Sequence, residues 1–270
     1  MQMKGRSIFT YDVYAPTMIT TMLRPRRQEG QTIILEAFNI QPPVPFSEYS
    51  DIYGNLCQRA ILPVGQVTIS TEVLALVNAQ HAPDPLPEFN LVENVPDAAM
   101  HYILPSRYCE SDLHEINLLA MEIAGNIAPG YAQVEAIRLW IYQNVKYQYG
   151  VTDASTTALD VARNRIGVCR DFTHLAIALC RNLCIPTRMT AGYLDKLKDM
   201  DLHAWFEVYM GGEWHPFDAV QEKTEGYRIE IAHGRDAADV AMVTQYGNAI
   251  LKSLHVEVEL MERAIPDHAE

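Results

Sequence analysis

Hydrophobic and polar residues alternate along the first part of the chain. Val67–Thr71 alternates with period two, 32–40 is rich in residues that favour strands, and 51–55 has the composition of a turn. These patterns predict an antiparallel β domain with the form of a sandwich over residues 1–78. Prolines crowd between Ala79 and Glu110, and we expect a connector there because proline removes a backbone donor.

The hydrophobic period changes to that of a helix after the connector. A helix is expected to start at Ser111 and Asp112, because Asp112 is a good cap and apolar residues follow at helical spacing. Further helices are expected over 132–145, over 157–165 and from Cys169 onward. The last of these carries one apolar stripe, formed by Phe172, Leu175, Ala176, Leu179 and Leu183. Cys169 is therefore predicted to lie at the N-terminus of a buried helix.

Period two returns after Pro186. It predicts strands over 187–194, 202–210 and 213–218, and a last strand with Leu254, Val256, Val258 and Leu260 on one face. Helices followed by an antiparallel sheet indicate an α+β arrangement. We therefore predict two domains, a β domain with its proline-rich connector over residues 1–110 and an α+β domain over residues 111–270.

Composition narrows the classes of function. The 270 residues are 49% hydrophobic and 20% charged, which suits packed cores. A net charge of -13 disfavours nucleic acid as a partner, and the cluster of Arg24, Arg26 and Arg27 is typical of a solvated edge. Because the chain has no apolar run of signal-peptide or membrane-spanning length, we expect a cytoplasmic protein with no membrane association.

The five cysteines point to a thiol used in chemistry. An odd number in a chain of this length does not suggest a disulfide framework, so we expect a reducing compartment and at least one free thiol. A helix N-terminus lowers the pKa of a thiol and offers N–H groups to an oxyanion, which singles out Cys169. Cys180 and Cys184 are expected inside the helix as packed, inert thiols, whereas Cys57 and Cys109 are expected to be structural. The pair Cys180 and Cys184 has no second pair at ligand spacing, so neither zinc nor another cofactor is predicted.

The thiol needs a base, and two histidines are candidates. His174 lies five residues beyond Cys169, or roughly 140° around the helix, and is not expected to reach the sulfur. His203 lies on a predicted strand and shares a face with Trp205, Glu207 and Tyr209. We predict that His203 is the base.

A hairpin register selects the third member of the site. If Gly211-Gly212 forms a two-residue turn, Met210 pairs with Glu213 and Asp218 lies diagonally beside His203. The same register turns His215 to the opposite face. Glu207 has the correct face but lies about 13 Å along the strand from His203. A catalytic triad of Cys169, His203 and Asp218 is therefore predicted.

Four sequence blocks carry a resemblance to a known family. They are Gly167–Leu175 (GVCRDFTHL), Cys184–Arg188 (CIPTR), His203–Val208 (HAWFEV) and Trp214–Asp218 (WHPFD). Together they resemble the core of transglutaminase-like bacterial enzymes, a group described as cysteine proteases and often preceded by an N-terminal β domain. The resemblance covers about residues 111–262, with Cys184 at a position where glycine commonly closes the helix. It implies a papain-like core in which the cysteine faces a sheet that bears histidine and aspartate.

The resemblance and the triad imply acyl transfer through a thioester to Cys169. Hydrolysis of a peptide or isopeptide bond is the first expectation, with a peptide or protein as substrate and no metal or cofactor required. Amine transfer by a protein-glutamine transglutaminase, with calcium dependence left open, and a non-catalytic binding module on the same fold are the alternatives. The Cys169 N–H is expected to form part of the oxyanion hole, with Tyr147 or Tyr149 as candidates for the second donor.

Overall fold

A computed structural model describes residues 1–80, 83 and 86–261 of the chain. The strands of the first half are β1 (Gln2–Val13), β2 (Thr17–Thr21), β3 (Gln31–Gln41), β4 (Phe46–Ser50), β5 (Leu56–Leu62), β6 (Gly65–Val77) and β7 (Ala79–Gln80). The helices are the 3-10 turn η1 (Val92–Asn94), α1 (Asp97–Met100), α2 (His114–Ala124), α3 (Tyr131–Asn144), α4 (Ala158–Asn164) and α5 (Cys169–Asn182). The remaining strands are β8 (Lys146–Tyr147), β9 (Ile166–Gly167), β10 (Thr187–Leu194), β11 (His203–Met210), β12 (Glu213–Phe217), β13 (Gly226–Gly234), β14 (Val243–Tyr246) and β15 (Ala249–Met261).

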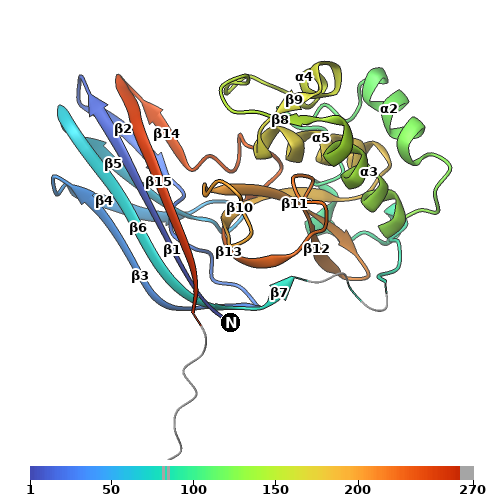
Figure 1. Cartoon of the computed structure of the whole chain (residues 1–270), viewed down its shortest axis with the longest axis horizontal. Coiled ribbons are helices and arrows are strands. Elements are labelled where there is room, and N and C mark those ends of the chain that lie inside the picture. Colours follow the sequence, from blue (N-terminus) through green and yellow to red (C-terminus); the bar gives the residue numbers. More distant parts are fainter. Residues whose placement is uncertain (81–82, 84–85, 262–270) are drawn as a thin grey trace, which may run out of the picture.

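Two four-stranded antiparallel sheets form a sandwich, with strand orders β15-β1-β6-β3 and β14-β2-β5-β4 (Figure 1). Burial alternates strictly along β1 and over most of β6, as the period-two pattern requires. The inward side chains of both sheets meet in one apolar cluster, which includes Phe9, Ile19, Leu62 and Ile69. The prediction of an antiparallel β region at the N-terminus is confirmed.

The last two strands return to this sandwich. β15 pairs with β1 from Gln2↔Met261 to Val13↔Ala249, and β14 pairs with β2. The expectation that the strand carrying Leu254 to Leu260 belongs to the C-terminal sheet is therefore wrong. The long strand β1 offers a free edge that β15 covers, and strand pairing of this kind leaves no mark in the hydrophobic period of either strand. The division at residue 110 stays a prediction, and residues 81–82, 84–85 and 262–270 of the two predicted domains lie outside the described residues.

A separate five-stranded sheet has the strand order β12-β11-β10-β13-β7, and α5 lies on it (Figure 1). Helices α2, α3 and α4 pack around α5, so that eleven of its fourteen residues are buried. β10 has the predicted bounds and β11 starts one residue later than expected, whereas β13 was not anticipated. This arrangement buries α5 along its length and leaves its N-terminus at the rim of the sheet.

Two expected helix boundaries are wrong. α2 starts at His114 with Leu113 as the extended cap residue, because the preceding residues form a turn in which the Leu113 N–H donates to the Glu110 carbonyl at 3.3 Å. α5 ends at Asn182, and Cys184 adopts a left-handed conformation with φ 60° beyond the helix. Cys184 is exposed, not packed inside the helix as expected.

The sandwich and the five-stranded sheet meet at Gly5 and Tyr193. A Cβ on Gly5 would lie 2.8 Å from the ring of Tyr193, so only glycine permits this approach. The buried Tyr193 hydroxyl lies 3.1 Å from Ser7 Oγ on the same strand β1. This contact sets the distance between the sandwich and the five-stranded sheet.

Candidate active site

Cys169 is the first residue of α5, and a buried carboxylate anchors the chain just before it. Asp171 Oδ2 accepts the Val168 N–H at 3.0 Å and the Thr152 hydroxyl at 2.6 Å. The acidic side chain in the first turn also suits the positive end of the helix dipole. Because Val168 is tied in this way, the thiol and the first N–H groups of the helix face the cleft from a fixed position.

The hairpin between β11 and β12 has the predicted register. Met210 pairs with Glu213 and Phe206 with Phe217, across Gly211 and Gly212, which both have positive φ. Ala204, Phe206, Val208 and Met210 enter the core beneath α5. His203 and Asp218 are consequently on the other side, at the end of the hairpin.

His203 Nε2 lies 2.7 Å from Asp218 Oδ2, with side chains that are only 2% and 0% exposed. Asp218 is held by further donors, since the Val220 N–H reaches Oδ1 at 2.9 Å and Arg228 Nη2 lies 3.7 Å from Oδ2. Arg138 donates to the carbonyls of Gln221 and Glu222 and thereby anchors the loop that follows β12. Asp218 is therefore held in place from several directions.

Opposing effects set the pKa of His203. Burial lowers it, but the charge of Asp218 and the hydrogen bonds to Asp218 and to the Cys169 side chain outweigh burial and raise the pKa of His203 to about 10. Burial likewise raises the pKa of Asp218, but the charge and hydrogen bond of His203, and then Arg228, lower it below its usual value. An imidazolium paired with a carboxylate is the favoured state of these two groups.

The ring of His203 connects Asp218 with Cys169. Because Nε2 faces the carboxylate, Nδ1 is the ring nitrogen left for the thiol, whose hydrogen bond contributes to the raised pKa of His203. Trp205 lies beside the ring in a near-parallel arrangement, with 6.3 Å between the ring centroids. The structure thus brings together the three residues that the sequence pattern selected.

Tyr147 is the aromatic neighbour of this thiol. β8 pairs with β9 so that Tyr147 lies opposite Gly167, two residues before Cys169. Burial raises the pKa of Tyr147, and the charge of Cys169 raises it further, so the phenol stays protonated and able to donate. Tyr149 packs edge-on against Tyr147, and its hydroxyl lies 3.4 Å from Asp201 Oδ2, so a carboxylate is already at hand for that hydroxyl.

The rejected candidates have other hydrogen-bond partners. His174 Nε2 accepts the Ala237 N–H at 3.1 Å, and burial lowers the pKa of His174 to about 4. Glu207 accepts Arg188 Nε at 2.7 Å, and His215 Nε2 lies 3.0 Å from the Met210 carbonyl. None of these three contacts involves His203 or Cys169, as the helical angle and the strand parity predicted.

The other thiols differ from Cys169 in burial. Cys57, Cys109 and Cys180 are buried, and burial raises the pKa of all three, that of Cys180 to about 12. All five cysteines are free. Cys169 is partly exposed and Cys184 is exposed. Cys184 is therefore the thiol whose reactivity must be compared with that of Cys169.

A cleft of about 650 Å³ opens over Cys169 and His203. One wall comes from the sandwich, through Phe9 and Tyr11 of β1 and Val243–Gln245 of β14. The opposite wall comes from α5 and the five-stranded sheet. The C-terminal strands, which were expected in the second domain, therefore form part of the site.

Some residues of the site were not anticipated. Arg138 and Arg228 are buried cations with no sequence pattern of their own, and their partners are distant in the chain. Asp171 did carry a signal, an acid at the third position of a helix that begins at Cys169. The arginine group is a solvated edge only at Arg27, which is 72% exposed, because Arg26 pairs with the buried Glu230 and Arg24 pairs with Glu36 and Glu48.

Neither a membrane-spanning helix nor a metal cluster is found in the described part of the chain. Among residues 1–80, 83 and 86–261, no helix has both the length and the apolar character needed to cross a bilayer. The same residues contain no group of three or more His, Cys, Asp and Glu side chains arranged to hold a metal ion. The cytoplasmic location stays a prediction.

Comparison with known proteins gives one family. The model of the transglutaminase-like superfamily matches residues 118–219, which include Cys169, His203 and Asp218. The crystal structure of a putative cysteine protease from Cytophaga hutchinsonii is similar over 98% of this chain and 92% of that chain, with 36% sequence identity and a TM-score of 0.90. An uncharacterized protein of Mycobacterium leprae is 28% identical over 257 residues, covering 90% of this chain and 91% of its own length. One from Mycobacterium tuberculosis is 28% identical over 254 residues, 85% of this chain and 81% of its own.

Proposed function

The chain belongs to the transglutaminase-like superfamily, and on that premise we propose that it is a cysteine-dependent acyl-transfer enzyme that hydrolyses amide bonds. Membership of this superfamily supports a cysteine-type enzyme in general. The finer assignment makes Cys169 the nucleophile, His203 the group that carries the proton and Asp218 the residue that orients His203. The observation that carries it is the buried contact of 2.7 Å between His203 and Asp218 beside the N-terminus of α5.

Acylation begins with the Cys169 thiolate and the His203 imidazolium. The sulfur attacks the carbonyl carbon of the amide, a C–S bond forms, and the carbonyl electron pair moves to the oxygen. When the tetrahedral intermediate collapses, the C–N bond breaks and the imidazolium gives its proton to the leaving nitrogen. A thioester and a free amine result. The raised pKa of His203 supports this role, because it keeps the proton available for the leaving group.

The oxyanion needs donors near the sulfur. The Cys169 N–H is one, since the first N–H groups of a helix have no partner within the helix. The Tyr147 hydroxyl is the proposed second donor, supported by the effect of Cys169 on its pKa and by the pairing of β8 with β9. The burial of Tyr147 keeps this phenol protonated.

Deacylation needs a water molecule activated by the now neutral His203. His203 accepts a proton from the water as the oxygen attacks the thioester, the C–S bond breaks, and the Cys169 thiolate and an imidazolium return with release of a carboxylic acid. Asp218 stabilises the imidazolium in both halves of the cycle. Each turnover consumes one amide and one water, and yields one amine and one acid.

The form of the cleft supports an extended peptide or isopeptide as substrate. Val243, Thr244 and Gln245 line it, and their strand β14 is the edge of its sheet. An edge strand offers backbone N–H and C=O groups to an added extended segment. The substrate would then lie between the sandwich and α5, with its scissile carbonyl over Cys169.

The experiment is turnover of a glutamine-containing peptide and of an isopeptide-linked peptide, followed by mass spectrometry. We expect a mass gain of one water per cleavage, and no product from Cys169→Ala or His203→Gln of unchanged melting temperature. A millimolar primary amine in the same reaction tests the alternative. Product that is mostly the amine adduct would identify a transglutaminase, whereas binding of the peptides without any product would indicate a binding module.

A further inference from the structure

The cleft over Cys169 has an apolar part that the acyl-transfer steps do not use. Part of its wall is the segment 237–242 (AADVAM), and every residue of this segment except Asp239 lines the cleft. Asp239 pairs with Arg235 instead, with Oδ2 2.8 Å from Nε. The charged side chain of the segment is therefore bound to a partner that does not line the cleft.

Large apolar side chains from both halves of the molecule line the same space. Leu202 and Met242 are partly buried and pack against two cores, that of the sandwich and that beneath α5. Phe9 and Tyr11 of β1 and Met189 of β10 also line the cleft and are 4%, 4% and 3% exposed. Because side chains packed in this way have little freedom to move, an apolar surface is held in place facing the cleft.

Charged groups are scarce in this cleft. Among the described residues that line it none is acidic, and its two arginines are Arg107 and Arg170. Arg170 pairs with Asp171 Oδ1 at 2.7 Å and donates to the Asp153 carbonyl at 2.6 Å. Arg107 is exposed, where an ion pair contributes little. A charged substrate group that entered the apolar part would lose its hydration without gaining a buried partner.

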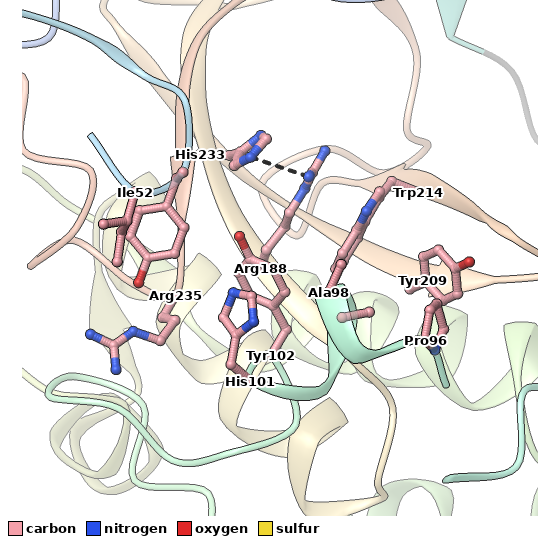
Figure 2. A pocket seen from close by; sticks show the side chains of 12 residues that line it. Ile52, Pro96, Ala98, His101, Tyr102, Arg188, Tyr209, Trp214, His233 and Arg235 are labelled. Atoms are coloured by element: carbon pink, nitrogen blue, oxygen red, sulfur yellow. Dashed lines mark hydrogen bonds between the residues drawn. The ribbon is translucent and has the colours of Figure 1, made fainter. Parts of the chain in front are cut away.

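A second cavity, of about 740 Å³, has a different lining (Figure 2). Its arginines, Arg188 and Arg235, are ion-paired with Glu207 and Asp239. It shares no lining residue with the cleft, and Ala98 of α1 is one of its exposed wall residues. A substitution of Ala98 therefore shows whether an effect is specific to the cleft.

We propose that the apolar part of the cleft is a specificity pocket for a large apolar side chain, so that the substrates are peptides with leucine, phenylalanine or a similar residue next to the scissile amide. This inference rests on the proposed function, because it assigns a substrate class to the same site. Contact with Phe9, Leu202 and Met242 removes apolar area of both partners from water. The three alanines of 237–242 carry only methyl groups and leave room for such a side chain in the cleft of about 650 Å³.

The test is NMR titration of Cys169→Ala, which cannot form a thioester, with five end-capped pentaglycine peptides. Their central residue is replaced by phenylalanine, leucine, alanine, aspartate or lysine, so each peptide can shift along the cleft until its one side chain meets the pocket. We expect the phenylalanine and leucine peptides to bind at least about 10-fold more tightly than the alanine peptide, and the two charged peptides to bind no more tightly than alanine. In the active enzyme, kcat/KM should follow the same order.

Variants in the Cys169→Ala background locate the pocket. Met242→Gln keeps the length of the side chain but makes it polar, and Ala241→Leu fills space in the cleft, so each is expected to weaken binding of the phenylalanine peptide by about 5-fold or more. Ala98→Leu is the matched control with unchanged binding, and a melting curve shows that each variant is folded.

Three results would overturn the proposal. They are a preference for the aspartate or lysine peptide, no binding of the phenylalanine peptide to the folded protein at about 10 mM, and an equal loss of binding in Ala98→Leu. Binding in the expected order without turnover by the active enzyme would support the pocket and contradict the acyl-transfer function instead.

Discussion

His203 Nε2 and Asp218 Oδ2 lie 2.7 Å apart at the open end of the hairpin formed by β11 and β12, and solvent is excluded from both side chains. The ladder between β11 and β12 ends at the pair Phe206–Phe217, and one further step of the same register makes Asp218 the diagonal neighbour of His203. The consequence of this contact is a histidine that favours the charged form although it is buried.

Asp218→Asn should cripple turnover with little effect on the fold. The amide has nearly the same shape, but it lacks the charge that stabilises the imidazolium, so kcat is expected to fall by about 100-fold or more. Steady-state kinetics on the peptide substrate and a melting curve measure the two effects separately. Glu207→Gln is the control, because it removes a carboxylate on the same sheet face that bonds Arg188 and not His203. If the control loses activity while Asp218→Asn keeps it, the assignment of the third residue is wrong.

Cys169 should be the first thiol to be alkylated. It is partly exposed at a helix N-terminus and has a histidine partner, whereas burial raises the pKa of Cys57, Cys109 and Cys180. Limiting iodoacetamide followed by peptide mass spectrometry identifies the labelled residue.

Cys184 is the necessary comparison in that experiment, because it is exposed. We expect labelling of Cys169 to be unchanged in Cys184→Ser and to slow by about 10-fold or more in His203→Gln, which removes the partner of the thiolate. Faster labelling of Cys184 than of Cys169 in the folded wild-type protein would contradict the assignment.

Tyr147→Phe tests the second oxyanion donor. The change keeps the packing against Phe172 but removes the hydroxyl, so kcat is expected to fall by about 100-fold while KM changes little. Tyr149→Phe is matched to it, because that ring packs on Tyr147 and its hydroxyl faces Asp201. Equal losses in the two variants would argue against a specific role for the Tyr147 hydroxyl.

The stability of the protein should depend on pH through His203. The pKa of this residue in the folded state, about 10, exceeds the ordinary value of 6.5, so the folded state binds the additional proton between these values. The stabilisation is therefore complete below pH 6.5 and is lost as the pH rises toward 10.

Urea unfolding across that interval measures the effect. The free energy of unfolding of the wild type should exceed that of Asp218→Asn most at the lower pH, by a few kcal/mol, and the difference should shrink toward pH 10. Asp160→Asn, which alters the first turn of α4, should keep the pH dependence of the wild type. A difference between the wild type and Asp218→Asn that grows with pH would mean that the pKa of His203 is lowered instead.

The sequence by itself determined the local geometry of the site. Helical period and a preceding glycine located the start of α5 at Cys169, and two adjacent glycines fixed the register that sets Asp218 beside His203. These features depend on contacts between residues close in the chain, for which a period of 3.6 or of two and a tight turn leave little choice. The parity of the hairpin likewise excluded His215, and the distance along β11 separated Glu207 from His203.

Only the tertiary structure decided how distant segments combine. The alternating pattern of β15 suits any half-buried strand, and it was the free edge of β1 that selected its partner and made β14 a wall of the cleft. The short pairing of β8 with β9 placed Tyr147 opposite Gly167, and Arg188 acquired Glu207, Trp214 and His233 as neighbours from three strands. Pairing and packing between remote segments depend on which surfaces the whole chain leaves uncovered, and a hydrophobic period records only that a face is buried, not what buries it.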